Sequence, residues 1–296
     1  MKKILVLTDF SYSSFNAARY AVMLAGTFNS CRIILYNSFV YIPITSEGAL
    51  PGAMDVTAFE EESMSRLRDV EISLAPFQKF GTSIECRTDQ RPLVKAAEEM
   101  VRNESVDLTV AGSKGRSVPG DLFFGSNTVN LINHFHMPLL IIPPKAIYEP
   151  VMSAVFACEL NQVEKIPVNT IRTFIRELQC KLFILNIDKH SEDQLNTDQI
   201  LQMSKLHELM DDTHPEYHYT NNRNIDEGIS QFCEKHQAGV LILIHKKYGF
   251  LHKLLHSSIT RKMATHAAIP LLVLKETSEY QGSEPEVETQ QEARNA

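Results

Sequence analysis

Two stretches of this sequence recur at one fixed spacing, and this repeat constrains the fold more than any other feature. The apolar run 106–111 returns as 238–243, and the run 137–142 returns as 269–274, in both cases 132 residues later. Self-similarity at a fixed offset indicates a repeated structural unit. A chain of 296 residues also has the length of about two domains. The sequence therefore predicts two copies of one unit.

Both copies alternate strand-like and helix-like patterns, which is typical of a parallel sheet with crossover helices. The expected strands lie near 3–8, 32–37, 83–87, 106–111 and 138–142, and again near 151–157, 181–187, 215–219, 239–244 and 270–274. The expected helices lie near 13–27, 63–80, 92–103 and 126–133, and again near 162–178, 194–211, 225–236 and 257–266. Right-handed crossovers would place helices on both faces. We therefore predict two tandem, doubly wound α/β units, each with a parallel sheet of five strands.

The expected boundaries follow from the connection between the units and from the end of the chain. The first unit spans residues 1–145 and the second spans 151–275, with a short proline-containing linker between them. Residues 276–296 carry several glutamates and no apolar period, which predicts a disordered acidic tail. Residues 40–55 form an insertion in the first unit, for which a lid over a ligand and an ordinary surface loop are equal alternatives.

The last expected strand of each unit predicts how the units associate. The runs 139–142 and 271–274 are short and apolar, and proline flanks them. A bare strand edge of this kind invites pairing with another strand. We therefore expect an intramolecular pseudo-dimer, in which the two units associate about a pseudo-twofold axis. A homodimer of two such chains is left open.

A glycine pattern follows the fourth expected strand of the first unit. Gly112 is followed after two residues by Gly115, and after nine more by Gly125 and Ser126. The strand delivers the backbone to the sheet edge, and glycines let the chain approach an anion closely. The following helix supplies unpaired N–H groups and a partial positive charge, while Ser126 and Thr128 add hydroxyl donors. This order indicates phosphate binding by the main chain, although it is neither a P-loop nor a GxGxxG motif.

The spacing of these glycines is similar to the nucleotide-binding signature of the universal stress protein family. Two further segments carry the resemblance: residues 3–11, which look like the family's first strand and contain Asp9, and residues 136–143, which look like its last strand. Together with the repeat, the resemblance covers nearly all of residues 1–275. It implies an adenine-nucleotide α-hydrolase-like fold and a bound ATP, ADP or AMP, with or without Mg²⁺. An ordinary glycine-containing loop is the alternative interpretation.

The resemblance also implies where the nucleotide would lie. Ligands of open α/β sheets bind outside the carboxyl ends of the strands. Asp9 would accept a hydrogen bond from the ribose, Ser38 and Phe39 would border the adenine, and the glycine loop would hold the phosphates. The complete predicted site consists of Thr8, Asp9, Ser38, Phe39, Ala111, Gly112, Ser113, Gly115, Gly125, Ser126, Asn127 and Thr128. Lys114 and Arg116 are candidates to offset phosphate charge, and Asn37 is given no role.

The second copy lacks the glycine pattern. At the offset of 132 residues, Gly112 becomes Ile244, Gly115 becomes Lys247 and Gly125 becomes Ser257, so that only the hydroxyl of Ser126 is kept, as Ser258. The segment 154–161 echoes the first expected strand, and there the longer Glu159 stands where Asp9 stood. Side chains with a Cβ, and branched bulk in one case, take the space that a phosphate would need. We therefore expect the second copy to be a structural or interaction partner of a nucleotide-binding first copy.

No catalytic equipment is recognisable beyond this pocket. The sequence has no acid pair, nucleophile–base pair or aspartate cluster for Mg²⁺ at an informative spacing, so no catalytic residue is assigned. The preferred hypothesis is an ATP-binding stress-response regulator with an unknown protein partner. Two alternatives stay open: an interaction scaffold that does not depend on nucleotide, and an enzyme, such as a weak ATPase or a nucleotidyl transferase.

Composition limits the partners and the compartment. A net charge of −7 argues against the basic face of a nucleic-acid binder, and no apolar run approaches the roughly 18 residues of a membrane span. There is no signal-like start, and the five cysteines have no metal-type spacing, which predicts reduced core thiols in the cytoplasm. The basic segment with His245, His252 and His256 is open to three interpretations: a solvated face, an anion-binding surface or a metal site, although no metal ligand is assigned.

Overall fold

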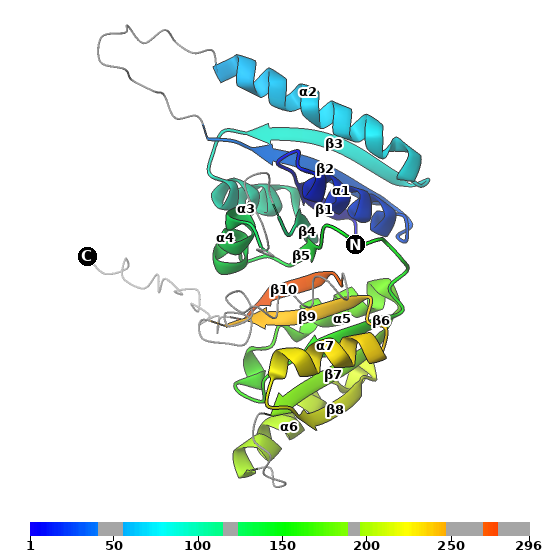
Figure 1. Cartoon of the computed structure of the whole chain (residues 1–296), viewed down its shortest axis with the longest axis vertical. Coiled ribbons are helices and arrows are strands. Elements are labelled where there is room, and N and C mark those ends of the chain that lie inside the picture. Colours follow the sequence, from blue (N-terminus) through cyan, green and yellow to red (C-terminus); the bar gives the residue numbers. More distant parts are fainter. Residues whose placement is uncertain (41–55, 115–123, 189–195, 247–268, 278–296) are drawn as a thin grey trace, which may run out of the picture.

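The computed structural model describes residues 1–40, 56–114, 124–188, 196–246 and 269–277, and it arranges ten strands in one continuous sheet (Figure 1). The strands are β1 (Lys3–Leu7), β2 (Cys31–Ser38), β3 (Thr82–Asp89), β4 (Leu108–Gly112), β5 (Leu139–Ile142), β6 (Ser153–Ala157), β7 (Lys181–Asp188), β8 (Glu216–Asn221), β9 (Val240–His245) and β10 (Leu271–Lys275). Their order across the sheet is β3-β2-β1-β4-β5-β10-β9-β6-β7-β8. Each half of the chain thus has the same doubly wound strand order.

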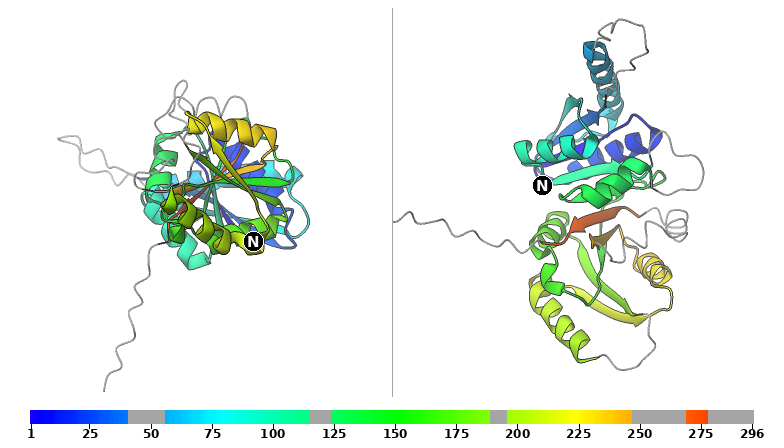
Figure 2. Two further views of the ribbon diagram at one scale, coloured as in Figure 1. Left: turned by 90° about the horizontal axis from the view of Figure 1, so that it is seen from below. Right: turned by 90° about the vertical axis from the view of Figure 1, so that its left-hand side faces the viewer.

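The helices of the first half are α1 (Tyr12–Ala25), α2 (Val56–Leu74), α3 (Leu93–Glu104) and α4 (Ser126–His134), with a 3₁₀ turn, η1 (Ala75–Phe77), after α2. Those of the second half are α5 (Val168–Leu178), α6 (Thr197–Met210) and α7 (Ile225–Lys235), with the 3₁₀ turns η2 (Val163–Lys165) and η3 (Asp211–Thr213). Figure 2 shows helices on both faces of the sheet. The predicted α/β class, with five parallel strands in each half, is confirmed.

The two halves join edge to edge through the short strands that the sequence singled out. β5 and β10 pair antiparallel, with Leu140 opposite Leu272 and neighbouring pairs on either side. The two parallel sheets therefore form one sheet instead of two separate ones. Pairing the last strands satisfies backbone groups that a free edge would expose. The antiparallel register also relates the two strands by a local twofold axis.

The core consists of two apolar layers, one on each face of the sheet, and both layers extend across the junction. Alternate residues of a strand point to opposite faces. Leu140 and Leu272 therefore lie in the layer beneath α1, α2, α5 and α6, whereas Ile141 and Leu271 lie in the layer beneath α3, α4 and α7. All four side chains are buried. The junction between the halves is thus part of the hydrophobic core.

Several elements differ from the sequence-based expectation or lie outside the described residues. The helix expected at 162–178 is divided into η2 and α5, because Pro167 lacks an N–H and forces the residue before it into an extended conformation. α2 begins at Val56, seven residues earlier than expected. Residues 41–55 of the possible lid at 40–55, the helix expected at 257–266 and most of the predicted tail fall outside the described residues.

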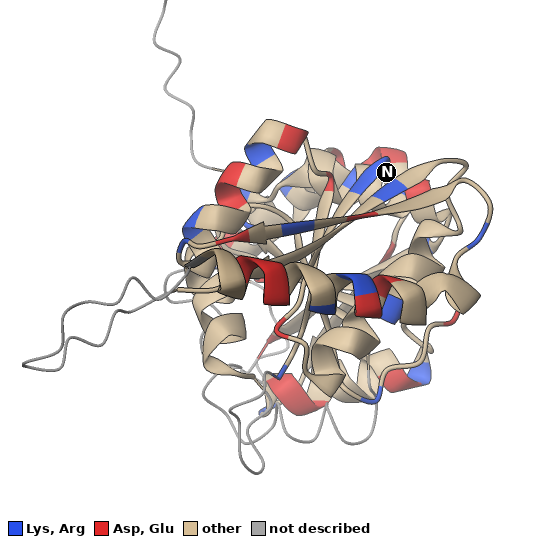
Figure 3. Ribbon diagram, turned by 90° about the horizontal axis from the view of Figure 1, so that it is seen from above, with Lys and Arg blue, Asp and Glu red and all other residues tan. Residues whose placement is uncertain are grey.

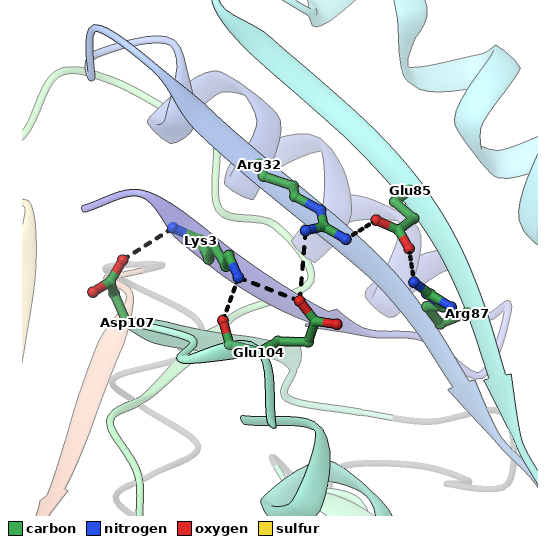
Figure 4. Close-up of polar contacts among 6 residues, drawn as sticks. All are labelled: Lys3, Arg32, Glu85, Arg87, Glu104 and Asp107. Carbon is green, nitrogen blue, oxygen red and sulfur yellow. Dashed lines mark hydrogen bonds and ion pairs between the residues drawn. The ribbon is translucent and has the colours of Figure 1, made fainter. Parts of the chain in front are cut away.

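A network of ion pairs ties together the amino ends of the first strands (Figure 4). The Lys3 ammonium lies 3.2 Å from the carboxylate of Glu104, which is also 3.5 Å from the Arg32 guanidinium. Arg32 pairs in turn with Glu85. The Asp107 carboxylate accepts the backbone N–H groups of Lys2 and Lys3 at 2.7 and 2.9 Å. This network lies at the opposite end of the sheet from the carboxyl ends of β1, β2 and β4.

The cysteines carry free thiols, and charged residues of both signs lie along the helices. All five cysteines are free, and burial raises the pKa of the Cys31 thiol to about 11 and that of the Cys233 thiol to about 12, so both stay protonated. In Figure 3, basic and acidic residues are interspersed along the helices in view. Among the described helices, none is both long and apolar enough to cross a membrane.

Candidate functional site

The carboxyl ends of β1, β2 and β4 open into a cleft of about 480 Å³, counting its open mouth. β1 lies between β2 and β4, so this is the point at which the strand order reverses and where ligands of open α/β sheets bind. The first turns of α1, α3 and α4 contribute to its walls. The lining residues are Leu7, Thr8, Asp9, Ser14, Ser38, Leu93, Ala111, Gly112, Lys114, Asn127, Thr128 and Leu131.

Seven of the twelve residues proposed from the sequence line this one cleft: Thr8, Asp9, Ser38, Ala111, Gly112, Asn127 and Thr128. Phe39, Gly125 and Ser126 are described but do not line it. Ser113 is fully buried, and its N–H and C=O bond to Ile142 O at 3.0 Å and to Gly125 N at 2.8 Å. Ser113 therefore connects the end of β4 to the end of β5 and to Gly125 at the start of α4. Gly115 and Arg116 lie outside the described residues.

Gly112 has a packing role that the sequence did not indicate. A Cβ at this position would lie 2.8 Å from both the carbonyl carbon and the carbonyl oxygen of Ser13, and 2.7 Å from its Oγ. The first turn of α1 thus passes directly over Gly112. The N–H of Lys114 also donates to Ser13 Oγ at 3.3 Å. Gly112 is needed for the contact between β4 and α1, whether or not an anion approaches it.

The first turn of α4 forms another wall of the cleft. Its N-cap is Gly125, which has extended backbone angles, and no side chain of the described residues caps this turn. The first N–H groups of a helix have no intrahelical acceptor and carry a partial positive charge. The Thr128 hydroxyl, proposed from the sequence as a phosphate donor, instead donates to Gly112 O at 2.9 Å. Thr128 thus ties α4 to the end of β4, and the main-chain N–H groups are the available donors.

Asp9 is held in place by the tight connection from β1 to α1. Its Oδ1 accepts the N–H of Ser11 at 3.0 Å, and Ser11 in turn caps α1 by accepting the N–H of Ser14 at 3.2 Å. The residue between them, Phe10, has a φ of 62°, a left-handed conformation that costs a non-glycine residue roughly 1 kcal/mol or more. The guanidinium of Arg66 lies over the Phe10 ring at 4.1 Å from its centroid. These contacts direct the Asp9 carboxyl to the cleft.

Sequence reasoning missed a buried chain of hydrogen bonds beneath the cleft. The side-chain amide of Asn37 donates to Thr8 O at 2.7 Å and accepts from the Ser63 hydroxyl at 2.8 Å. The Thr88 hydroxyl donates to Ser63 at 3.1 Å. The chain joins the carboxyl ends of β1, β2 and β3 to α2. An asparagine in an otherwise apolar strand was the available signal, because a buried amide needs partners.

The rim of the cleft beside β2 is fixed by a second polar group. The Ser38 hydroxyl donates to Arg91 O, and the N–H of Phe39 donates to Asp89 O at 3.0 Å. The Arg91 guanidinium binds both carboxylate oxygens of Asp89, at 2.9 and 2.7 Å. Hydrogen bonds from Arg91 hold the pKa of Asp89 at about 2. Asp89 is therefore charged and paired at neutral pH, and it stiffens this side of the rim.

The corresponding end of the second half keeps the amide contact but differs at the glycine positions. Asn186 donates to Cys158 O at 3.0 Å, as Asn37 does to Thr8 O. Ile244, in place of Gly112, packs against the apolar layer beneath α5. Lys246, which corresponds to Lys114, extends its ammonium to Asn161 O at 2.7 Å, with Glu276 at 3.7 Å. The Lys246 ammonium is thus engaged by groups of the second half.

The predicted basic segment of the second half is only partly described. His245 lies 3.3 Å from Asn133 Oδ1, whereas His252 and His256 are outside the described residues. In the part of the chain that the structure describes, no three His, Cys, Asp or Glu side chains are grouped to hold a metal ion.

Comparison with known proteins identifies the first half of the chain. Residues 1–143 match the model of the universal stress protein family. A universal stress protein from Archaeoglobus fulgidus is 14% identical with a TM-score of 0.64, and the alignment covers 93% of this chain and 97% of that one. A putative universal stress protein from Pseudomonas aeruginosa is 13% identical with a TM-score of 0.56, covering 93% and 94%. These likenesses show that the fold is shared along almost the entire chain. None of the curated proteins matches the sequence.

Proposed function

We propose that this chain, whose residues 1–143 match the model of the universal stress protein family, is a stress-response protein whose first unit binds one adenine nucleotide. The observation that supports this most strongly is the cleft at the carboxyl ends of β1, β2 and β4. Seven residues proposed from sequence alone lie around it, although they come from four separate segments of the chain. The cleft also has the polarity that a nucleotide requires. Apolar side chains line one part, and hydroxyl, amide and charged groups line the rest.

The ligand orientation follows from the charges. The phosphates of ATP, ADP or AMP would lie against the first turn of α4, because its N–H groups offer a partial positive charge and have no intrahelical acceptor. The ribose would meet Asp9, whose carboxylate is an acceptor for a sugar hydroxyl. The base would lie toward Ser38 and Leu93. Asp9 is also the single carboxylate among the described lining residues, so it alone could join a phosphate in holding Mg²⁺.

We further propose that the unit of residues 151–275 is a structural and interaction partner that does not bind nucleotide in the same way. Ile244 and Lys246 at the end of β9 support this, since one adds bulk and the other already donates to Asn161 O. The β5–β10 pairing makes this unit part of the same sheet. Binding is favoured over turnover, because one carboxylate supplies neither an acid–base pair nor a two-metal site.

A matched pair of substitutions tests the placement of the ligand. Asp9→Asn keeps an Oδ1 acceptor for the Ser11 N–H but removes the charge proposed to accept from the ribose. A hydrogen bond to a charged group contributes about 1.5–3 kcal/mol, so the Kd for ATP should rise at least about tenfold. Glu159→Gln, at the corresponding position of the second half, should leave the Kd unchanged. Calorimetric titration of both variants measures the Kd for ATP. An equal rise in Kd in the two variants, or no rise in Asp9→Asn, would refute the proposed contact of Asp9 with the ribose.

A further inference from the structure

Lys275, at the end of the last strand of the second half, contacts the helix that borders the cleft of the first half. Its ammonium donates to Ile132 O at 2.7 Å and to Asn133 O at 2.9 Å, and it lies 2.9 Å from His245 Nδ1. Ile132 and Asn133 belong to the last turn of α4. Figure 1 shows α4 next to β10 at the junction between the halves. The lysine thus crosses from one half to the other.

The contact supplies hydrogen-bond donors to carbonyl groups in the last turn of α4. The last carbonyl groups of a helix have no intrahelical donor and carry a partial negative charge, which a cation offsets. The N–H of the C-cap residue, Phe135, bonds to Leu131 O, so the carbonyls of Ile132 and Asn133 are left for Lys275. Burial lowers the pKa of Lys275 to about 8, which leaves the ammonium the main form at neutral pH. Lys275 therefore caps α4 with a charge.

The position of this lysine is asymmetric between the two halves. The residue 132 positions before Lys275 is Pro143, which has neither a charge nor an N–H. At this repeat position only the second half has a cation, and that cation contacts α4, the helix that follows the intact glycine pattern. His245, which contacts Lys275 and Asn133, corresponds in the same way to Ser113. The repeat alone does not explain this pair, because both residues are particular to the second copy.

We propose that Lys275 is a positioning residue of the nucleotide site, supplied by the second half through α4. α4 has only nine residues, and isolated helices this short are marginal in water. One end of α4 borders the cleft, where its N–H groups would meet the phosphates, and the other end is held by Lys275. Phosphate at the first turn and a cation at the last turn both favour the helical form, so each strengthens the effect of the other. This inference rests on the proposed nucleotide binding.

The test compares Lys275→Met with Lys246→Met, and it adds Lys275→Arg. Lys246 is a suitable control, because it is a lysine of the second half that directly follows β9 and whose ammonium contacts Asn161 O and the Glu276 carboxylate instead of α4. Lys275→Met should weaken ATP binding by about three- to tenfold, as expected for loss of a helix-terminal charge. Lys246→Met should not change the affinity, and Lys275→Arg should restore most of it. Equal weakening by both methionine variants, or by neither, overturns the proposal.

Hydrogen exchange without nucleotide provides the second measurement. Amides at the start of α4 should exchange faster in Lys275→Met than in the unmodified protein, and at an unchanged rate in Lys246→Met. This result does not depend on ATP. If the unmodified protein fails to bind ATP, the proposed function is wrong while the link from Lys275 to α4 is still measured. Unchanged exchange in α4 would overturn the link itself.

Discussion

Replacing Gly112 with alanine is expected to abolish or severely weaken nucleotide binding and to destabilise the protein. The added Cβ would lie 2.8 Å from the backbone of Ser13, closer than real contacts allow, so the start of α1 must move. Overpacking of this kind costs about 1–3 kcal/mol of unfolding free energy. The movement displaces Ser14 and the turn that holds Asp9, so the Kd for ATP should rise at least about tenfold. Chemical denaturation and calorimetric titration measure the two effects.

Gly26→Ala is the matched control for this substitution. A Cβ at Gly26 would also make a close contact, 2.7 Å, but with the flexible side chain of Lys79, which can move aside at little cost. Its stability and its affinity for ATP should therefore stay close to those of the unmodified protein. If Gly112→Ala behaved like Gly26→Ala, the close packing of β4 against α1 would not be required for the site.

Replacing Asn37 with alanine is expected to have the second-largest effect. The substitution removes the donor to Thr8 O and the acceptor of the Ser63 hydroxyl, both in a buried setting. Leaving buried polar groups without partners costs about 1–3 kcal/mol. Because Thr8 directly precedes Asp9 and lines the cleft, ATP binding should weaken along with stability.

Asn186→Ala makes the same change in the second half, where Asn186 donates to Cys158 O at 3.0 Å. We expect it to lower the unfolding free energy without changing the affinity for ATP, since that end of the sheet is not proposed to bind nucleotide. The comparison separates a loss of general stability from a loss of the site. Equal weakening of ATP binding by both alanine variants would contradict a site confined to the first half.

Repetition and buried apolar strands made the architecture predictable from sequence. The strands β4 and β9 begin at Leu108 and Val240, and β5 and β10 begin at Leu139 and Leu271, each pair at the offset of 132 residues read from the sequence. Such strands are recognisable because their residues are buried on both faces, which leaves continuous apolar runs. The edge pairing of β5 with β10 was also predictable, because two short apolar edges in one chain can satisfy each other.

The details of the candidate site were less predictable, because they depend on contacts between segments far apart in the chain. The sequence indicated where the glycines and Asp9 would lie, but not that α1 presses on Gly112 or that Thr128 donates to Gly112 O. Leu93 and Leu131 line the cleft only because of how α3 and α4 pack. The role of Asn37 needs Ser63, which is 26 residues away. A linear pattern contains none of these distances.

The stoichiometry of ATP binding tests the central claim most directly. It is measured by calorimetry on protein stripped of co-purified ligand, with Gly112→Ala and Lys246→Met titrated alongside. The account predicts one site per chain, lost or strongly weakened in Gly112→Ala and kept in Lys246→Met. Two sites per chain would contradict the division between a binding first unit and a silent second one. No binding would contradict nucleotide binding itself and would leave the tandem units as an interaction scaffold.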